Sequence, residues 1–368
     1  MSIRPAHLRF AAEALGLILP RRAPADAILR AQFQRTRAGS KDRAAISALV
    51  YGVLRNYFPL RAELGEAAAP LDLITAHAER GVLPGSNLLP TIEGALIEQY
   101  GADEAARLAA GLNEPATVDL RVNTLKGTRE AAIAALAEDN IAAVPLPGTP
   151  NGLRLAKREA LQRTRALRQG LIEPQDEGSQ RLAEFVAAKP GELVADFCAG
   201  AGGKTLALGA AMKNEGELWA FDVNKARIAP LADRVTRAGL TIVREQMIRD
   251  ENDTRLQAHT RKFNAVLVDS PCSALGTLRR NPELRLTAPD LPALADLQGR
   301  ILAAAAKLVR EGGRLIYATC SVLRAENEDV VAAFLAAHPD FRQQGDPMVL
   351  LPHRDGTDGF FAVRLRRK

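Results

Sequence analysis

The chain has 368 residues, of which 47% are hydrophobic, and its formal net charge is +6. This composition is typical of an ordinary globular protein with two or three domains. No apolar run reaches the roughly 18 residues that a membrane-spanning helix needs, and three widely spaced cysteines exclude a disulfide framework.

The cysteine, histidine and charged residues also indicate in which cellular compartment the protein works and what kind of partner it binds. Free cysteines favour a reducing, cytoplasmic location. The five histidines are scattered and no Cys-x-x-Cys pair occurs, so we expect no metal. Glu13 and the pair Arg21-Arg22 interrupt the first apolar stretch, which predicts an amphipathic helix and no signal peptide. The basic excess suits an anionic partner such as nucleic acid, although a GC-rich genome, which encodes Arg and Ala freely, explains it as well.

Residues 1–111 have a helical pattern. Segments such as Ala27–Phe33 and Arg43–Tyr57 place apolar residues three and four positions apart. Prolines punctuate the stretch at Pro59, Pro70, Pro84 and Pro90. The pattern predicts an all-helical domain of five or six helices.

Residues 112–190 change character. Val118–Asn123 alternates like a strand, Thr128–Asp139 is periodic like a helix, and Pro145–Pro150 is rich in turn residues. This stretch predicts a small α+β module. Two clusters of basic residues are candidates for nucleic-acid contact. One spans residues 154–168 and consists of Arg154, Lys157, Arg158, Arg163, Arg165 and Arg168, and the other consists of Arg279, Arg280 and Arg285. A third group at the end of the chain, Arg364, Arg366, Arg367 and Lys368, is more simply explained as an exposed basic tail.

From residue 191 to 368, strands and helices alternate. The expected strands are Glu192–Phe197, Leu218–Asp222, Thr241–Arg244, Phe263–Asp269, Arg314–Thr319 and Phe360–Leu365. Four helices are expected. The first runs from the glycine loop through Met212, the second follows the strand that ends at Asp222 and runs to Arg237, and the others cover Asp290–Arg310 and Ala325–Ala337. Alternation of this kind predicts an α/β domain with a mostly parallel sheet covered on both faces.

A glycine-rich loop follows the first of these strands. Its sequence is Asp196-Phe-Cys198-Ala199-Gly200-Ala201-Gly202-Gly203-Lys204-Thr. Glycines let the backbone approach a ligand, and ligands of such sheets bind at the carboxyl ends of the strands. Asp222 ends the next strand and is suited to bind ribose hydroxyls. A dinucleotide or S-adenosylmethionine would fit, whereas the alternatives are a tight strand–helix turn for the loop and a helix N-cap for Asp222.

Two thiols fall at the same edge of the predicted sheet. Cys272 follows the strand that ends in Asp269, and Cys320 ends another strand. A lone free cysteine is most often a small buried hydrophobe, but two beside an aspartate at the ligand edge indicate chemistry. Methylation of cytosine at ring carbon 5 needs a thiolate to add to carbon 6, a carboxyl group near nitrogen 3 and a route for expelling the thiol.

These strings resemble the Sun/Nop-type RNA (cytosine-5) methyltransferases, most closely the bacterial 16S rRNA enzymes of that group. The strings are DFCAGAGGKT, DSPCSALGTLRRNPE, ATCSVLRAENE and DGFFAVRL. Gln175–Gln180 and Leu120–Leu125 resemble family strings before the catalytic domain, and Asp42-Arg with Val50–Arg55 resembles a NusB-like domain. The resemblance implies a helical NusB-like RNA-binding domain at 1–111, a small α+β, RRM-like module at 112–190 and a Rossmann-like class I methyltransferase sheet at 191–368.

The resemblance also assigns roles to residues. Cys320 would be the nucleophile, Cys272 would support product release, and Asp269 would bind the target base and lie against the cofactor. The residues expected to hold S-adenosylmethionine are Cys198, Ala199, Gly200, Ala201, Gly202, Gly203, Lys204, Asp222, Arg227, Gln246 and Asp269. Gly200-Ala201 replaces the family's usual Ala-Pro. The usual adenine-contacting aspartate is also missing; Gln246 falls at that position, with Glu245 as the alternative.

The implied activity is S-adenosylmethionine-dependent methylation of carbon 5 of a cytosine in RNA, most simply 16S rRNA, through a covalent cysteine–cytosine intermediate. The pair of thiols argues for RNA over DNA, because DNA enzymes attack with the Pro-Cys thiol. Two alternatives stay open: a tRNA cytosine-5 methyltransferase, or a non-catalytic RNA-binding or ribosome assembly factor. We expect a monomer that binds RNA and has no membrane contact.

Overall fold

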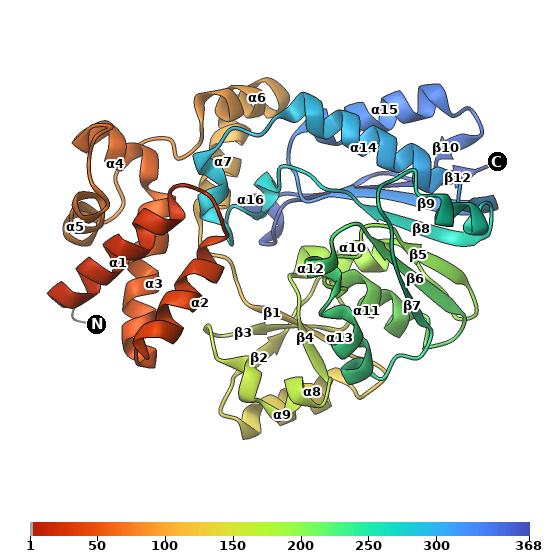
Figure 1. Cartoon of the computed structure of the whole chain (residues 1–368), viewed down its shortest axis with the longest axis horizontal. Coiled ribbons are helices and arrows are strands. Elements are labelled where there is room, and N and C mark those ends of the chain that lie inside the picture. Colours follow the sequence, from red (N-terminus) through yellow and green to blue (C-terminus); the bar gives the residue numbers. More distant parts are fainter. Residues whose placement is uncertain (1–2) are drawn as a thin grey trace. The chain divides into compact units, whose positions relative to one another are not determined.

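The computed structural model describes residues 3–368, which form two compact units (Figure 1). The helical unit contains the residues up to Pro115 together with Thr277–Pro289. The sheet unit contains Ala116–Gly276 and Asp290–Lys368. In residues 3–368, no helix has both the length and the apolar character needed to cross a membrane. The three-part division at residues 111 and 190 stays a prediction.

The helical unit has seven α-helices before Pro115, more than the five or six expected. They are α1 (Pro5–Ile18), α2 (Ala25–Thr36), α3 (Ser40–Arg55), α4 (Tyr57–Leu64), α5 (Pro70–Arg80), α6 (Pro90–Tyr100) and α7 (Ala102–Asn113). The expected helix Arg43–Tyr57 is divided at Asn56, whose side chain bonds the backbone of Gly81 and Leu83. Gly101, with φ of 78°, separates α6 from α7. Both breaks depend on single residues inside continuous helical patterns.

The segment Thr277–Pro289 packs inside the helical unit, although it follows the Cys272 string in sequence. It contains the 3-10 helix η4 (Pro282–Leu286). Arg285 is 2% exposed and donates to Asn113 Oδ1 at 2.6 Å. Glu283 accepts a hydrogen bond from the backbone of Ala25 at 3.0 Å. Arg279 is also buried, at 4% exposure, so Arg279 and Arg285 stabilise this unit and do not form an exposed RNA-contact cluster.

The sheet unit begins with a small four-stranded antiparallel sheet in the order β2-β3-β1-β4. Its strands are β1 (Asp119–Val122), β2 (Ala143–Pro145), β3 (Gly152–Leu155) and β4 (Ile172–Pro174). Helices α8 (Arg129–Glu138) and α9 (Arg165–Arg168) and the 3-10 helix η1 (Leu161–Arg163) accompany it. Leu120, Leu136, Leu153 and Ile172 form its apolar core. The expected strand and helix of the small α+β module are both present.

The large sheet has eight strands in the order β10-β12-β9-β8-β5-β6-β7, with β11 paired to β12. The strands are β5 (Leu193–Asp196), β6 (Glu217–Asp222), β7 (Val243–Met247), β8 (Phe263–Asp269), β9 (Val309–Thr319), β10 (Phe341–Gln343), β11 (Met348–Leu350) and β12 (Phe360–Arg367). Strands β5 to β9 pair in parallel with their neighbours, whereas β12 pairs antiparallel with β9, β10 and β11. The expectation of a mostly parallel, Rossmann-like methyltransferase sheet is confirmed.

Both faces of this sheet are buried. Along β8, Val266 and Val268 join an apolar cluster with α14, while Ala265 and Leu267 join a second cluster with Leu208 of α11. Burial on both faces explains why β8 is a continuous apolar run. The helices are α10 (Glu177–Phe185), α11 (Gly203–Ala211), α12 (Lys225–Ile228), α13 (Leu231–Ala238), α14 (Leu291–Ala306), α15 (Glu328–Ala337) and α16 (Pro352–Asp355). The remaining 3-10 helices are η2 (Thr254–His259), η3 (Leu275–Thr277) and η5 (Arg324–Glu326).

Some boundaries differ from expectation. The helix expected over Asp290–Arg310 ends at Ala306, and β9 begins at Val309, five residues before the expected Arg314. Val309 is drawn into the sheet because it pairs with Phe263. Strand β7 begins and ends slightly later than Thr241–Arg244, and β10 and β11 were not anticipated. These short strands depend on pairing with β12, which local sequence does not reveal.

Candidate active site

Four strands of the large sheet deliver polar residues to one edge. Asp196, Asp222, Asp269 and Thr319 end β5, β6, β8 and β9. The register places Asp196 beside Ala220 and Leu267, and Asp269 beside Ala318. Since these strands are parallel, their carboxyl ends lie at the same edge, where ligands of such sheets bind. The cofactor loop, Cys198–Lys204, leaves β5 at that edge.

The two thiols predicted to carry the chemistry lie in contact. Cys272 Sγ and Cys320 Sγ are 3.4 Å apart, and both residues are partly exposed. The hydrogen bond to Cys320, together with burial, holds the pKa of the Cys272 thiol well above its ordinary value. Either thiol can be the donor in this contact, and the raised pKa of Cys272 favours its S–H form. The structure brings together two residues that lie 48 positions apart in sequence.

Lys204 and Asp269 form an ion pair at the same edge. Lys204 Nζ lies 2.6 Å from Asp269 Oδ2 and 5.6 Å from the centre of the Phe360 ring. Burial acts to lower the pKa of Lys204, but the charge of Asp269 and its hydrogen bond outweigh it and hold the pKa above the ordinary value. Cys320 contributes to the same upward shift. Lys204 is therefore an ammonium ion at the sheet edge that also carries the two thiols.

The cofactor loop needs glycine at two positions. Gly200 has φ of 53° and Gly202 has φ of 85°, both in the left-handed region that favours glycine. A Cβ on Gly202 would lie 2.1 Å from Leu231 Cδ1, so no side chain fits there. Gly202 N-caps α11, and a Cβ added to Gly203 would meet no atom closer than Gln175 Nε2, at 3.9 Å. The loop therefore presents bare backbone at the start of α11.

Asp222 and Arg227 hold this loop from the side. Asp222 accepts hydrogen bonds from the backbone amides of Gly200 and Asn224, each at 2.7 Å. The alternative of a helix N-cap for Asp222 is wrong, because Asn224 caps α12 and its side chain accepts from the amides of Ala226 and Arg227. Each carboxylate oxygen can accept a further hydrogen bond, so ribose binding remains compatible with this arrangement. The Arg227 guanidinium lies beside Gly200, where an added Cβ would be 3.2 Å from Nη2.

Asp196, which ends β5 just before the loop, is buried, and Cys198, the first residue of the loop, is half-buried. Burial raises the pKa of Asp196 to about 6; its Oδ2 accepts from Thr205 at 2.7 Å, and its Oδ1 has no partner within the described residues. Burial and the charges of Asp196, Asp269 and Asp222 hold the pKa of Cys198 well above its ordinary value. Cys198 is thus a neutral thiol and not a nucleophile.

The residues considered for adenine lie on β7. Gln246 Oε1 is 3.2 Å from His259 Nε2, and His259 packs against Trp219. Glu245 is exposed, and partial burial raises the pKa of its carboxyl group. The register pairs Asp222 with Met247, one residue beyond Gln246. The assignment of either residue to adenine stays a prediction.

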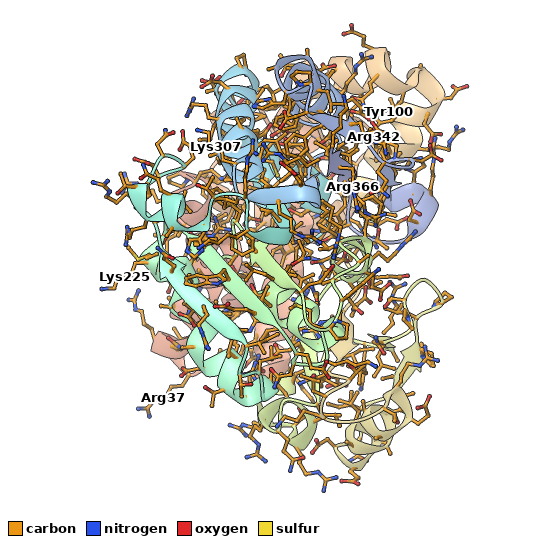
Figure 2. The ribbon with its side chains drawn as sticks, turned by 90° about the vertical axis from the view of Figure 1, so that its right-hand side faces the viewer. Arg37, Tyr100, Lys225, Lys307, Arg342 and Arg366 are labelled. Carbon is orange, nitrogen blue, oxygen red and sulfur yellow. The ribbon has the colours of Figure 1, made fainter. Side chains whose placement is uncertain are left out.

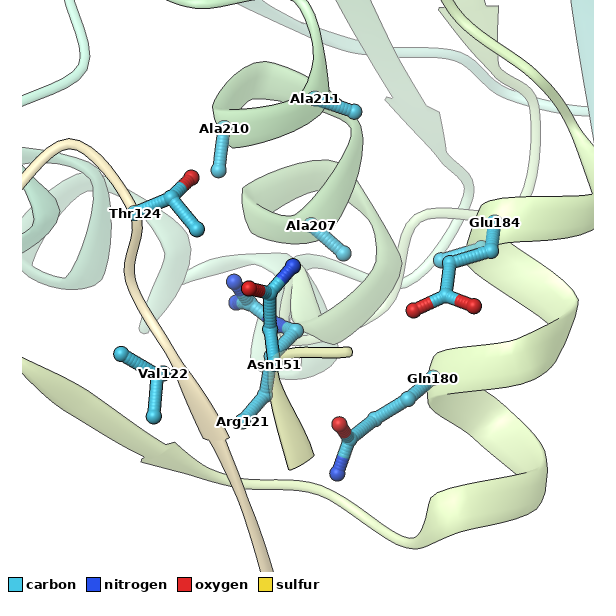
Figure 3. A pocket seen from close by; sticks show the side chains of 10 residues that line it. Arg121, Val122, Thr124, Asn151, Gln180, Glu184, Ala207, Ala210 and Ala211 are labelled. Atoms are coloured by element: carbon cyan, nitrogen blue, oxygen red, sulfur yellow. The ribbon is translucent and has the colours of Figure 1, made fainter. Parts of the chain in front are cut away.

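A separate hollow in the sheet unit is too small to be the cofactor site. It has a volume of about 70 Å³ and is lined by residues of β1, α10 and α11, among them Arg121, Gln180 and Glu184 (Figure 3). A water molecule occupies about 30 Å³ of liquid, so this space suits two waters and no nucleoside. Among residues 3–368, no group of three or more His, Cys, Asp or Glu side chains is placed to hold a metal ion.

Sequence reasoning missed the residues that hold the thiols in place. Glu326 and Asn327, at the end of η5, are buried and bond to residues adjacent to both cysteines. Gln298 of α14 donates to the carbonyl of Pro271 at 3.0 Å. Glu326 and Asn327 lie in the string ATCSVLRAENE, but only their partners in space reveal a role.

The basic clusters are partly neutralised. Arg154 binds Asp119 at 2.7 Å and Glu177 at 3.2 Å, and Lys157 and Arg165 pair with Glu159 and Glu138. Arg158, Arg163 and Arg168 remain exposed. The basic end of the chain is no free tail, because Arg364, Arg366 and Arg367 belong to β12. Figure 2 shows Arg342 and Arg366, which face each other across β10 and β12.

Comparison with known proteins agrees with this geometry. A family model described as 16S rRNA methyltransferase RsmB/F matches residues 183–366, and a second, for the ferredoxin-like domain of these methyltransferases, matches residues 93–162. A protein of Pseudomonas putida described as ribosomal RNA small subunit methyltransferase B is 30% identical over 375 residues, 92% of this chain and 86% of that protein. Probable counterparts from Synechocystis and Bacillus subtilis are 35% and 33% identical. The chain spans 65% and 64% of the length of those two.

Solved structures match the fold. A crystal structure of a protein named PH0851 has a TM-score of 0.87 at 25% identity and covers the whole of both chains. A methyltransferase homologue from Pyrococcus horikoshii has a TM-score of 0.64 at 26% identity, over 76% of this chain and 100% of that one. The resemblance stated from the cysteine and glycine strings is confirmed, and the chain belongs to the RsmB/F family of 16S rRNA methyltransferases.

Proposed function

We propose that this protein transfers a methyl group from S-adenosylmethionine to carbon 5 of a cytosine in 16S rRNA, through a covalent bond between Cys320 and carbon 6. The observation that carries the proposal is the contact of two thiols, 3.4 Å apart, beside the Lys204–Asp269 ion pair at the carboxyl edge of the sheet. A cytosine ring is activated at carbon 5 only after a nucleophile adds to carbon 6. A thiolate beside a fixed cation and an acid is suited to that step.

S-adenosylmethionine is the cofactor of this family and fold, and it supplies an electrophilic methyl group on a sulfonium cation. The residues present fit such a group. The cofactor loop offers bare backbone at Gly203, where an added Cβ would meet nothing closer than Gln175 Nε2 at 3.9 Å. The carboxyl groups of Asp196, Asp222 and Asp269 all act on Cys198, the first residue of the loop, so acidic groups surround the loop where a cation would bind. The unpartnered Asp196 Oδ1 is a further acceptor.

The chain's own residues account for the steps at the base. Cys320 attacks as a thiolate, favoured by the nearby ammonium of Lys204, and its sulfur forms a bond to carbon 6 while the electron pair of the carbon 5–carbon 6 double bond moves into the ring. Asp269, held by Lys204, faces the ring nitrogen 3 side and passes a proton from the Lys204 ammonium to nitrogen 3 as the electron pair arrives there, so that no negative charge is left on the ring. After methylation the carbon 5 proton leaves to a base, and the sulfur–carbon 6 bond breaks so that the double bond returns.

Cys272 assists the last step. Its S–H lies 3.4 Å from the Cys320 sulfur and can donate a hydrogen bond to the departing thiolate. A proton donor at this point lowers the energy of the expelled sulfur, since charge-assisted hydrogen bonds are stronger than neutral ones. The target base must leave its stack to reach this edge. The exposed Arg158, Arg163 and Arg168 are suited to contact the RNA backbone.

The test uses 16S rRNA and tRNA from cells that lack the gene, incubated with the protein and S-adenosylmethionine, followed by bisulfite sequencing of both RNAs. We expect one or a few protected cytosines in 16S rRNA and none after Cys320→Ala substitution. Methylation confined to tRNA would contradict the substrate. Methylation at a position other than carbon 5, or retained after loss of Cys320, would contradict the mechanism. No measurable affinity for S-adenosylmethionine would favour an assembly factor without catalysis.

A further inference from the structure

Glu326 is an acidic residue inside the active-site region that the mechanism above does not use. It ends η5 and its side chain is buried, with 0% exposure. Its Oε1 accepts hydrogen bonds from the backbone amide of Ser273 at 2.8 Å and from Gln298 Nε2 at 3.0 Å. Its Oε2 accepts from the hydroxyl groups of Ser273 and Ser321. All four partners can donate, which is the arrangement that an ionised carboxylate needs.

The partners of Glu326 connect it to both thiols. Ser273 follows Cys272 in sequence, and Ser321 follows Cys320. Gln298, which donates to Glu326, also donates to the carbonyl of Pro271, the residue before Cys272. One carboxylate therefore joins the loop after β8 to the loop after β9, directly behind the two sulfur atoms.

The same junction is reinforced from β9. The Tyr317 hydroxyl donates to the backbone carbonyl of Glu326 at 2.5 Å. Asn327 donates to the carbonyl of Ser321 at 3.1 Å and accepts from the Thr319 hydroxyl. The carboxylate is therefore fixed in position from both sides.

A buried carboxylate without a cation partner costs free energy, so it is not the most stable means of joining two loops. Desolvating an ion costs several kcal/mol, and Glu326 forms no ion pair within residues 3–368. Neutral hydrogen bonds alone could join the loops with an amide or a hydroxyl group. The negative charge itself must then matter, and the groups nearest to it are the thiols.

The charge acts on Cys272 in particular. The hydrogen bond to Cys320 and burial are the larger causes of its raised pKa, and Glu326 adds to them. The other charged or titratable groups around the pair are Lys204 from α11, Asp269 from β8 and Tyr317 from β9. Lys204 forms its ion pair with Asp269, and burial, Cys272 and Glu326 raise the pKa of Tyr317, so it stays neutral.

We propose that Glu326 is a positioning residue whose hydrogen bonds keep the two sulfur atoms in contact and whose charge makes Cys272 the hydrogen donor of the pair. Cys320 is left as the acceptor, which is the form in which it attacks. This inference rests on the proposed function for its meaning, but the property itself, unequal protonation of two adjacent thiols, exists in the protein without RNA or cofactor. Position along the chain gives the two cysteines equivalent places. Glu326 distinguishes them, because two of its hydrogen bonds come from Ser273, next to Cys272, and one comes from Ser321, next to Cys320.

The test measures alkylation of each thiol by iodoacetamide between pH 6 and 10 in the full-length protein, with peptide mass spectrometry to separate Cys272 from Cys320. Glu326→Gln keeps the length of the side chain and removes its charge, whereas Glu326→Asp keeps the charge and shortens the reach. Asp329→Asn is the matched control, because it removes one negative charge from an exposed site nearby. The alkylation measurement needs no RNA, so its failure is distinct from failure of the proposed function; methyl transfer to 16S rRNA is measured separately on the same variants.

In the wild-type protein we expect Cys320 to be alkylated faster than Cys272 at a fixed pH in this range. Glu326→Gln should raise Cys272 alkylation on the order of tenfold at a fixed pH near 8, as expected when one nearby like charge is removed. Glu326→Asp should leave the pH dependence of Cys272 in place while lowering methyl transfer. Asp329→Asn should match wild type in both measurements.

Equal pH profiles for Glu326→Gln and wild type would overturn the proposal, as would an equal change in Asp329→Asn. If Glu326→Gln does not fold, Ser321→Ala takes its place, because it removes one donor to Oε2 and leaves the charge. That variant should keep the wild-type order of thiol reactivity and lose methyl transfer. If Cys272 reacts before Cys320 in the wild-type protein, Cys272 is not the hydrogen donor of the pair, and the proposal is refuted whatever the variants show.

Discussion

Replacing different glycines in and near the cofactor loop by alanine should change protein stability by different amounts. Replacement of Gly202 by alanine meets two obstacles: its φ is 85°, and the new Cβ would lie 2.1 Å from Leu231 Cδ1. A left-handed non-glycine residue costs about 1–2 kcal/mol, and overpacking costs about 1–3 kcal/mol. We therefore expect Gly202→Ala to destabilise the protein by about 2–5 kcal/mol.

Two other glycines separate these effects. Gly191 has φ of 80° but nothing within 4 Å of an added Cβ, so Gly191→Ala should lose only the backbone part, about 1–2 kcal/mol. Gly203 is the first residue of α11, and a Cβ there would meet only Gln175 Nε2 at 3.9 Å. Alanine is favoured over glycine in helices by about 0.8–1.0 kcal/mol, so Gly203→Ala should cause no loss of stability.

The assay is thermal unfolding of each variant beside titration with S-adenosylmethionine. At about 2–4 °C per kcal/mol for a domain of this size, Gly202→Ala should melt about 4–20 °C lower and Gly191→Ala about 2–8 °C lower. Gly203→Ala should melt as the wild type does but bind S-adenosylmethionine at least tenfold more weakly, because its new methyl group occupies the open side of the loop. Wild-type stability in Gly202→Ala would refute the loop geometry, and wild-type cofactor affinity in Gly203→Ala would refute the loop as the cofactor cradle.

Three further predictions follow from the charges of the sheet unit. The raised pKa of Asp196, about 6, means that its neutral form stabilises the fold below about pH 4 and that this contribution is lost as the pH rises through 6. The free energy of unfolding of Asp196→Asn, measured by chemical unfolding, should therefore rise relative to that of wild type by about 2–3 kcal/mol as the pH is raised from 4 to 7. A difference between the two proteins that stays constant with pH would contradict a buried acid at this position. Asp269→Asn should remove the partner that raises the pKa of Lys204, lowering methyl transfer at least a hundredfold, and full activity would refute the ion pair's role. Charge reversal at Arg158, Arg163 and Arg168 should weaken RNA binding and reduce the slope of log affinity against log salt concentration by about 0.7 per lost contact. Replacement of Arg154, which is paired with Asp119, by glutamate should instead lower the stability of the fold. Unchanged RNA binding after the charge reversal would exclude this surface.

The sequence predicted the parts of the fold that local patterns determine. Strand β8, Phe263–Asp269, appears with the expected bounds because an apolar run buried on both faces ends at a charged residue and a proline. The boundary between α14 and β9 did not follow from local sequence, because Val309 is held by Phe263 across the sheet. The division of the first long helical pattern likewise depends on Asn56 bonding to Gly81 and Leu83, which lie far along the chain.

The candidate site shows the same limit. Both cysteines, Asp269 and the glycine loop could be placed at one sheet edge, because carboxyl ends of parallel strands must meet there. The partners of these residues could not be placed. Glu326 is one acid among many in the sequence, and only the fold brings it to Ser273, 53 residues away. Arg154 similarly resembled an RNA contact until its bond to Asp119, 35 residues away, identified it as structural.

The central claim is that Cys320 forms the bond to cytosine and Cys272 releases it. Incubation of the Cys272→Ala variant with 16S rRNA and S-adenosylmethionine, followed by denaturing electrophoresis, tests this most directly. We expect a covalent protein–RNA adduct to accumulate, and none to form with Cys320→Ala or with both cysteines replaced. An adduct that persists without Cys320 would contradict the account.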